Sequence, residues 1–136
     1  MVIDPSRIHV AGTSAGGIHT AQMLYRRSNY IASVATYSGG IPEDEAFTPT
    51  TRDASNRVPA IIMYGSMDFL SAASFGLEDD LTDRGHFAVL CEHDRGHGIA
   101  APLAPSVWSF FEAHPYKTTS PWAEGLPADL YEGCAL

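Results

Sequence analysis

Residues 8–17, with the sequence IHVAGTSAGG, contain the pattern on which the interpretation of the whole chain depends. Within it, Gly12-Thr13-Ser14-Ala15-Gly16 matches G-x-S-x-G, with an apolar run before it and a helix-like segment after it. A strand–turn–helix of this kind presents a serine nucleophile on a sharp turn. Gly12 and Gly16 are expected to leave room for tight packing around that turn. The backbone N–H of Ala15 is expected to face a developing oxyanion. The alternative is a turn whose serine only caps the helix.

Four short apolar runs further along the chain predict buried strands. They are almost continuously apolar, which favours a parallel sheet covered on both faces, and they occupy residues 7–10, 33–37, 60–64 and 87–91. Apolar residues at helical spacing predict helices at about 14–27, 71–83 and 105–113. This order predicts one α/β domain over residues 1–136, with about four mainly parallel strands flanked by helices. Residues 41–57 are expected to form a loop, and residues 116–136 a tail that wraps the surface.

Asp68 is the candidate acid. A serine hydroxyl is a weak nucleophile until a base takes its proton, and that base needs an orienting carboxylate. Asp68 follows the third apolar run and the glycine turn at Gly65, and sites in open α/β sheets gather at the carboxyl ends of strands. The alternative is an aspartate that only caps the following helix. The other acids nearby are expected to be solvated on a helix surface: Asp79, Asp80 and Asp83.

His97 is the candidate base, because it lies in the loop after the last apolar run, between Gly96 and Gly98. Flanking glycines allow a loop histidine to approach a nucleophile. His93, nearer to the strand end, is the alternative. Of the remaining histidines, His9 is interpreted as a core or sheet-edge residue. Surface or capping groups are expected for the others: His19, His86 and His114. The spacing of histidines and cysteines does not suggest a zinc site.

Three segments together resemble the polyhydroxybutyrate depolymerase and feruloyl esterase branch of the α/β-hydrolases. Residues 4–17 resemble its nucleophile segment, residues 58–68 its acid strand and residues 85–98 its histidine loop. The resemblance spans roughly residues 4–114. It implies that Ser14 is the nucleophile, Asp68 the triad acid and His97 the general base. It also implies hydrolysis of carboxylic esters through an acyl-enzyme, with no metal or organic cofactor.

The candidate residues for lining a substrate site are Tyr37, Met67 and Phe69, because they lie at strand ends beside the expected triad. Core packing is the alternative for each of them.

The sequence also departs from that branch. Its members carry about four more strands before the serine segment, together with a loop, often HGGG-like, that supplies a second oxyanion N–H. The chain contains no HGGG-type motif, so Ala15 is the one backbone donor that can be named. We therefore expect a truncated α/β-hydrolase fold that lacks the N-terminal strands and leaves residues 8–10 exposed at one edge. Because an exposed apolar strand is prone to association, we expect a homo-oligomer in which another copy covers Ile8–Val10. A fragment that needs its N-terminal half is the alternative.

Charge and composition limit the classes of partner that the chain is expected to bind. The net charge is −8, and Lys117 is the only lysine, so the chain has no basic patch for nucleic acid. No apolar stretch approaches the roughly 20 residues that cross a bilayer, and residues 1–5 lack the regions of a signal peptide. Cys91 lies in an apolar run and is expected to be a buried free thiol. A disulfide to Cys134 is the alternative if the chain is exported.

The sequence as a whole predicts a serine carboxylesterase that acts on short-chain or small aromatic esters. Triad chemistry of this kind is shared by thioesterases and peptidases on the same scaffold, which are the first alternative. A non-catalytic fragment or binding module is the second.

Overall fold

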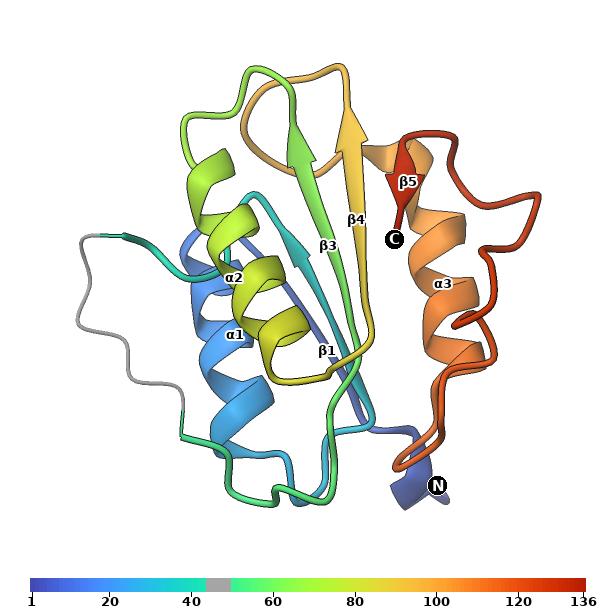
Figure 1. The fold of residues 1–136 in the computed structure, drawn as a ribbon. Helices are drawn as coiled ribbons and strands as arrows, with labels where there is room; N and C mark the ends of the chain where they lie inside the picture. The colour runs from blue at the N-terminus through green and yellow to red at the C-terminus, as the bar shows by residue number, and fades with distance from the viewer. Residues whose placement is uncertain (44–49) are drawn as a thin grey trace.

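Four parallel strands form the centre of the molecule in the computed structural model, which describes residues 1–43 and 50–136. They are β1 (His9–Thr13), β2 (Ser33–Tyr37), β3 (Ala60–Gly65) and β4 (Ala88–His93). A short fifth strand, β5 (Cys134–Ala135), pairs antiparallel with β4, so the described sheet has the order β1-β2-β3-β4-β5. All four parallel strands end at the same edge of the sheet, at the top of Figure 1. This edge collects the loops that carry the candidate residues.

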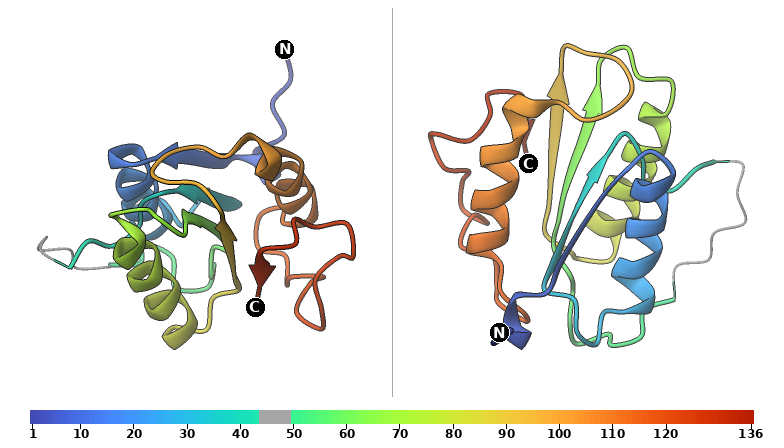
Figure 2. Two further views of the ribbon diagram at one scale, coloured as in Figure 1. Left: turned by 90° about the horizontal axis from the view of Figure 1, so that it is seen from above. Right: turned by 180° about the vertical axis from the view of Figure 1, so that it is seen from behind.

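Helices cover both faces of this sheet. Helices α1 (Ala15–Arg26) and α2 (Ser71–Asp83) lie on one face, and α3 (Ala104–Ala113) lies on the other (Figure 2). Two short 3-10 helices, η1 (Pro5–Arg7) and η2 (Ala101–Leu103), precede β1 and α3. None of the described helices has the length and apolar character that a membrane span requires. The expected α/β class, mainly parallel strands flanked by helices, is confirmed.

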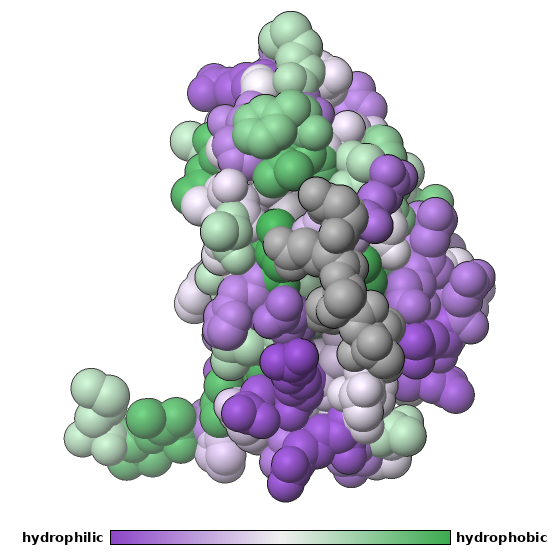
Figure 3. Space-filling model, turned by 90° about the vertical axis from the view of Figure 1, so that its left-hand side faces the viewer, coloured by the Kyte–Doolittle hydropathy of each residue, from purple (hydrophilic) through white to green (hydrophobic). Residues whose placement is uncertain are grey.

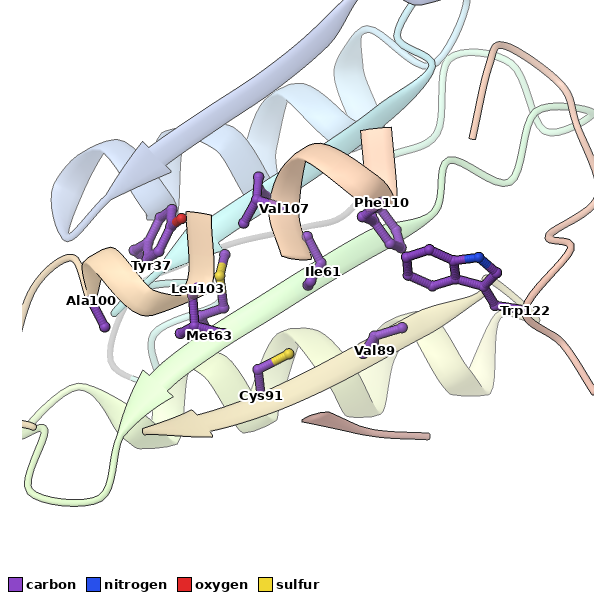
Figure 4. Close-up of a cluster of buried hydrophobic side chains, with 11 residues drawn as sticks. Tyr37, Ile61, Met63, Val89, Cys91, Ala100, Leu103, Val107, Phe110 and Trp122 are labelled. Atoms are coloured by element: carbon purple, nitrogen blue, oxygen red, sulfur yellow. The ribbon is translucent and has the colours of Figure 1, made fainter. Parts of the chain in front are cut away.

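Alternate residues of the strands face two separate cores. Ile61, Met63 and Val89 pack toward α3 together with Phe110 (Figure 4), whereas Val34, Ala60 and Ile62 pack toward α1 and α2. Every residue of β2 is buried. Because both sides of each central strand must be apolar, the strands appear in the sequence as continuous apolar runs. Full burial of a large aliphatic or aromatic side chain contributes about 1.5–3 kcal/mol to stability.

The element boundaries match the predictions best in the middle of the chain. Strand β2 and helix α2 coincide with the predicted residues 33–37 and 71–83. The first strand begins later than predicted, because residues 5–7 form a 3-10 turn in which the Asp4 carboxylate accepts a hydrogen bond from the Ser6 N–H. Strands β3 and β4 are longer than predicted and reach Gly65 and His93. Of the predicted loop at 41–57, residues 44–49 lie outside the described residues, and the remainder has neither helix nor strand.

The tail after α3 is more than a surface wrap. Trp122 is buried in the core beside Phe110 (Figure 4), and residues 134–135 extend the sheet as β5. Cys91 and Cys134 are register partners of β4 and β5 and form a disulfide. The prediction of a free Cys91 thiol is therefore wrong. The sequence gives no periodicity in the tail from which this pairing could be derived.

Candidate active site

Ser14 occupies a strained turn between β1 and α1. Its backbone has φ 56° and ψ −121°, a conformation that residues other than glycine rarely adopt. The turn is held by hydrogen bonds from the Ser14 N–H to the Tyr37 carbonyl, at 2.9 Å, and from the Ile18 N–H to the Ser14 carbonyl, at 3.0 Å. The Ser14 side chain makes no capping hydrogen bond to the helix. Ser14 is therefore the N-cap residue of α1 by position, but its hydroxyl does not cap the helix.

Close backbone contacts around this turn explain some of its glycines. A Cβ atom on Gly12 would lie 2.2 Å from the carbonyl oxygen of Gly16, and one on Gly39 would lie 2.6 Å from that of Ser14. Gly17 has its nearest neighbours at 3.2 Å. Gly16, in contrast, has nothing within 4 Å of its would-be Cβ. The expected need for a glycine in tight packing is thus found at Gly12. It is wrong for Gly16, which contributes only its carbonyl group to the close contact with Gly12.

Three residues from three loops form one hydrogen-bonded chain at the carboxyl edge of the sheet. His97 Nε2 lies 2.8 Å from Ser14 Oγ, and His97 Nδ1 lies 2.9 Å from Asp68 Oδ1. These loops follow β1, β3 and β4, which all end at this edge (Figure 1). Because a carboxylate only accepts hydrogen bonds, the ring hydrogen of His97 lies on Nδ1. Nε2 is then free to accept the hydrogen of the serine hydroxyl. The arrangement can therefore withdraw a proton from Ser14.

The Asp68 carboxylate is buried and yet ionised. Burial alone would raise its pKa, but the Ser38 hydroxyl, the Leu70 N–H and His97 hold the pKa below its ordinary value. The Leu70 N–H donates to Asp68 Oδ1 at 2.9 Å. The Asp68 side chain has no exposed surface, whereas the His97 ring is one-quarter exposed. A buried carboxylate that keeps its charge is suited to orient a histidine and to stabilise an imidazolium.

Ala15 is the first residue of α1, beside Ser14. The first hydrogen bond of the helix is donated by Ile18, so the N–H groups of Ala15, Gly16 and Gly17 precede the intrahelical ladder. Such N–H groups attract an anion. Ala15 therefore lies at the helix start, as the sequence predicts, and its role as oxyanion donor stays a prediction.

His93, the alternative base, is placed differently. Its ring is buried, and its Nδ1 accepts a hydrogen bond from the Arg95 N–H at 3.2 Å. No hydrogen bond joins it to Ser14 among the described residues. Burial lowers its pKa, so the ring is neutral at neutral pH. His97 is thus the histidine that this structure brings to the serine.

The other histidines serve the fold. His9 is half-buried and stacks on Phe111 with the ring centroids 4.7 Å apart, and His19 is exposed. The prediction of a surface or capping role is wrong for His86, which is buried and hydrogen-bonded to the Val58 carbonyl. His114 is also buried, but it is the C-cap residue of α3, and its Nδ1 lies 2.7 Å from the Phe110 carbonyl oxygen, so the predicted capping role fits this residue. Burial lowers the pKa of both rings. Among the described residues, no group of three or more potential ligands could hold a metal ion.

The candidate lining residues divide into two groups. Tyr37 is 8 % exposed and belongs to the core under α3 (Figure 4), so its predicted place in the substrate site is wrong. Met67 and Phe69 are 74 % and 78 % exposed, and the Phe69 ring centroid lies 4.5 Å from that of His97. Figure 3 shows apolar atoms gathered at this upper end of the molecule. Ser14 itself is partly exposed.

Ser38 is a residue of this region that the sequence analysis missed. It directly follows β2, is fully buried and has φ 52°. Its hydroxyl accepts a hydrogen bond from the Gly98 N–H at 2.9 Å and lies 3.2 Å from the Gly98 carbonyl oxygen. Its position at a strand's carboxyl end is the same signal that identified Asp68, and it was available in the sequence.

The fold is shared with solved structures of about twice the length. Two substituted forms of SOBER1 from Arabidopsis thaliana superpose with a TM-score of 0.68 at 19% and 20% identity, each covering 81% of this chain and 54% of SOBER1. A carboxylesterase from Bacillus cereus superposes with a TM-score of 0.63 at 17% identity, over 80% of this chain and 50% of that enzyme. The chain thus spans about half the length of these structures. No protein-family model and no curated protein sequence matches the chain. At this level of identity the comparison shows the fold alone, a mainly parallel sheet flanked by helices that these longer structures share.

Proposed function

We propose that the chain is a serine hydrolase that cleaves carboxylic esters through an acyl-enzyme. The hydrogen-bonded chain from Ser14 through His97 to Asp68 carries this proposal, with contacts of 2.8 Å and 2.9 Å. A nucleophile, a base and an orienting carboxylate within hydrogen-bond distance are the arrangement that activates a serine. The strained Ser14 backbone supports it, because strain of this kind is concentrated at functional sites.

In the proposed mechanism, His97 Nε2 takes the proton of Ser14 Oγ as that oxygen attacks the ester carbonyl. Asp68 holds the ring and stabilises the imidazolium that forms. The Ala15 N–H donates to the oxyanion of the tetrahedral intermediate, whose collapse returns the proton to the departing alcohol. Water, activated by His97 in the same way, then attacks the acyl-enzyme and releases the acid. Each donor of an oxyanion site typically contributes roughly 10²–10³-fold to the rate.

The substrate that we propose is a short-chain or small aromatic carboxylic ester, as in the polyhydroxybutyrate depolymerase and feruloyl esterase branch that the motifs resemble. Met67 and Phe69 support an apolar substrate, because both are exposed on the loop that carries Asp68. The Phe69 ring, against His97, can cover one side of an acyl group or of an aromatic leaving group.

The test compares the wild-type chain with Ser14→Ala on p-nitrophenyl acetate and p-nitrophenyl butyrate. We expect hydrolysis by the wild type and background rates for the variant, with the same thermal unfolding midpoint for both. Ser106→Ala is the matched control, because Ser106 is a serine of α3 that donates no hydrogen bond to the proposed triad. Faster turnover of a thioester or an amide would assign the same triad to a thioesterase or a peptidase. Equal, background rates for both proteins would remove the enzymatic function and favour a binding module.

A further inference from the structure

We propose that Ser38 is a positioning residue for the proposed triad, whose hydroxyl fixes the main chain beside His97 and supplies a hydrogen to the Asp68 carboxylate. The inference rests on the proposed function and adds a fourth side chain to the proposed site. Ser38 lies at the carboxyl end of β2, between the strands whose loops carry Ser14 and Asp68. It is therefore in the middle of the group without touching the reacting atoms.

The first contact fixes the histidine loop. The Gly98 N–H donates to Ser38 Oγ at 2.9 Å, and Gly98 directly follows His97. Gly98 has φ 123° and nothing within 4 Å of a would-be Cβ, so side-chain packing does not hold this residue. The Ser38 hydroxyl is the anchor from β2 that sets the position of the peptide next to the His97 ring.

The second contact concerns the hydrogen of the Ser38 hydroxyl. A serine hydroxyl donates one hydrogen, and two acceptors lie near it. The Gly98 carbonyl oxygen is 3.2 Å away, which is long for a hydroxyl donor. The other acceptor is the Asp68 carboxylate, whose Oδ2 is buried and has no hydrogen-bond partner among the described residues, so it is open to a donor. A buried anion gains more from one donor than a carbonyl does. The Ser38 hydroxyl is accordingly among the groups that lower the pKa of Asp68.

The backbone of Ser38 supports the same inference. Its φ of 52° is held by a hydrogen bond from its N–H to the Met63 carbonyl, at 2.8 Å. Glycine adopts this conformation at lower cost. A fully buried serine at this position therefore needs a compensating role for its hydroxyl. The observed contact with Gly98 and the proposed hydrogen bond to Asp68 provide it.

The expected effect of removing the hydroxyl has a definite direction. A carboxylate that loses a donor becomes more basic, so the Asp68–His97 pair takes up its proton at higher pH. The titratable groups that face Asp68 are His97 and, at longer range, His93, which is itself surrounded by Glu92, Asp94 and Arg95. We expect Ser38→Ala to lower kcat/KM by roughly 10-fold to 100-fold, the loss typical of one hydrogen bond to a charged group. The acidic limb of the pH profile should move to higher pH.

Ser74→Ala is the matched control. Ser74 is also fully buried, and its hydroxyl donates to the neighbouring Gly39 carbonyl at 3.2 Å, but it makes no contact with the triad. Ser38→Gly, which accepts φ 52° readily, provides the second variant in case Ser38→Ala is poorly folded. Loss of folding in both Ser38 variants would overturn the proposal, since Ser38 would then be a structural residue. An acidic limb that stays in place while Ser14-dependent hydrolysis persists would also overturn it.

A measurement without substrate separates this proposal from the proposed function. The His97 imidazole is titrated by NMR in the wild type, both Ser38 variants and Ser74→Ala. We expect a higher midpoint in the Ser38 variants alone, whether or not the chain hydrolyses esters. Equal midpoints in all four proteins would overturn the role of Ser38. Absence of Ser14-dependent hydrolysis with a raised midpoint would overturn the proposed function and leave the Ser38 contact established.

Discussion

The Asp68 side chain is fully buried, and its pKa nevertheless lies below the ordinary value of 3.8. A group whose pKa is lowered by folding contributes stability above its unfolded pKa and loses that contribution as the pH falls through the folded pKa. We therefore expect Asp68→Asn to unfold at a lower temperature than the wild type at about pH 7, with a difference that shrinks toward about pH 3. Thermal melts of both proteins across this range measure it. A difference that stays constant would contradict the assigned ionisation.

The same substitution tests the tautomer of His97. An amide in place of the carboxylate can offer its N–H to Nδ1 and so place the imidazole hydrogen on Nε2, where it no longer accepts the Ser14 hydrogen. We expect kcat for p-nitrophenyl acetate to fall by roughly 10³–10⁴-fold, the loss known for the corresponding change in a serine protease triad. Asp79→Asn on the surface of α2 is the control and should keep the wild-type rate.

Phe69 tests the proposed substrate surface. Because its ring is 78 % exposed, Phe69→Ala should leave the unfolding temperature almost unchanged. It should raise KM for p-nitrophenyl esters by about 5-fold to 10-fold, since an aromatic contact contributes about 0.5–1.5 kcal/mol beyond its area. Trp108→Ala, which removes a ring that is 65 % exposed on α3, should leave KM unchanged. Equal KM values for Phe69→Ala and the wild type would exclude Phe69 from the substrate surface.

At the scale of single residues, the sequence predicted site residues by their position just after a predicted strand. Ser14, Asp68 and His97 were identified because each follows an apolar run, and the structure brings them together. Tyr37 was assigned wrongly, because the side chain at a strand end faces either the core or the loops and the apolar run alone does not distinguish them. Ser38 also follows an apolar run and could have been selected on that ground, but its contact with Gly98, 60 residues away in the chain, is not visible in the sequence.

The crossing of β1 and α1 determines how the serine is presented. The carbonyl of Gly16 on α1 approaches Gly12 on β1 so closely that a Cβ would lie at 2.2 Å. We expect Gly12→Ala to destabilise the protein by about 3 kcal/mol, at the upper end of overpacking effects. Gly16→Ala, with open space around it, should be neutral or more stable by up to about 1 kcal/mol, because alanine favours the helix. Urea unfolding of both variants decides this, and equal midpoints would contradict the predicted contact.

The disulfide joins β5 and the tail to β4. It closes a segment with a sequence separation of 43 residues, and the chain-entropy model assigns to such a loop about 4 kcal/mol. We expect Cys134→Ser to lose about that amount of unfolding free energy. Dithiothreitol should not change the unfolding midpoint of this variant any further. Wild-type protein in dithiothreitol should unfold at the same urea concentration as the variant. If reduction left the wild-type midpoint unchanged, β5 would contribute little to the stability of the sheet.

At the level of elements, continuous apolar runs were sufficient to predict the four parallel strands. Strand β5 was not predictable in this way, because it has only two residues and its pairing is set by Cys91 of β4 rather than by a local pattern. The burial of Trp122 was missed for a similar reason, since its neighbours Phe110 and His114 come from α3 and the segment after it. Contacts distant in the chain, rather than propensity, order the tail.

For the whole molecule, the decisive feature is the outer edge of β1. Strand β1 pairs with β2 on one side, and no described strand pairs with its other side. Met1, Val2 and Ile3 lead into this strand, are highly exposed and project away from the body (Figure 2). An open strand edge beside exposed apolar side chains is a site of association. We propose that a second copy of the chain covers Ile8–Val10 at this edge.

Light scattering at micromolar concentration tests this oligomer. We expect the wild-type chain to show a multiple of its 14.6 kDa mass. Ala11 is exposed on β1, so Ala11→Lys places a charge at the proposed contact and should shift the mass toward the monomer. Ala128→Lys makes the same change at an exposed position of the tail and should leave the mass unchanged. A stable wild-type monomer would contradict the proposal, because the β1 edge would then tolerate solvent without a second copy.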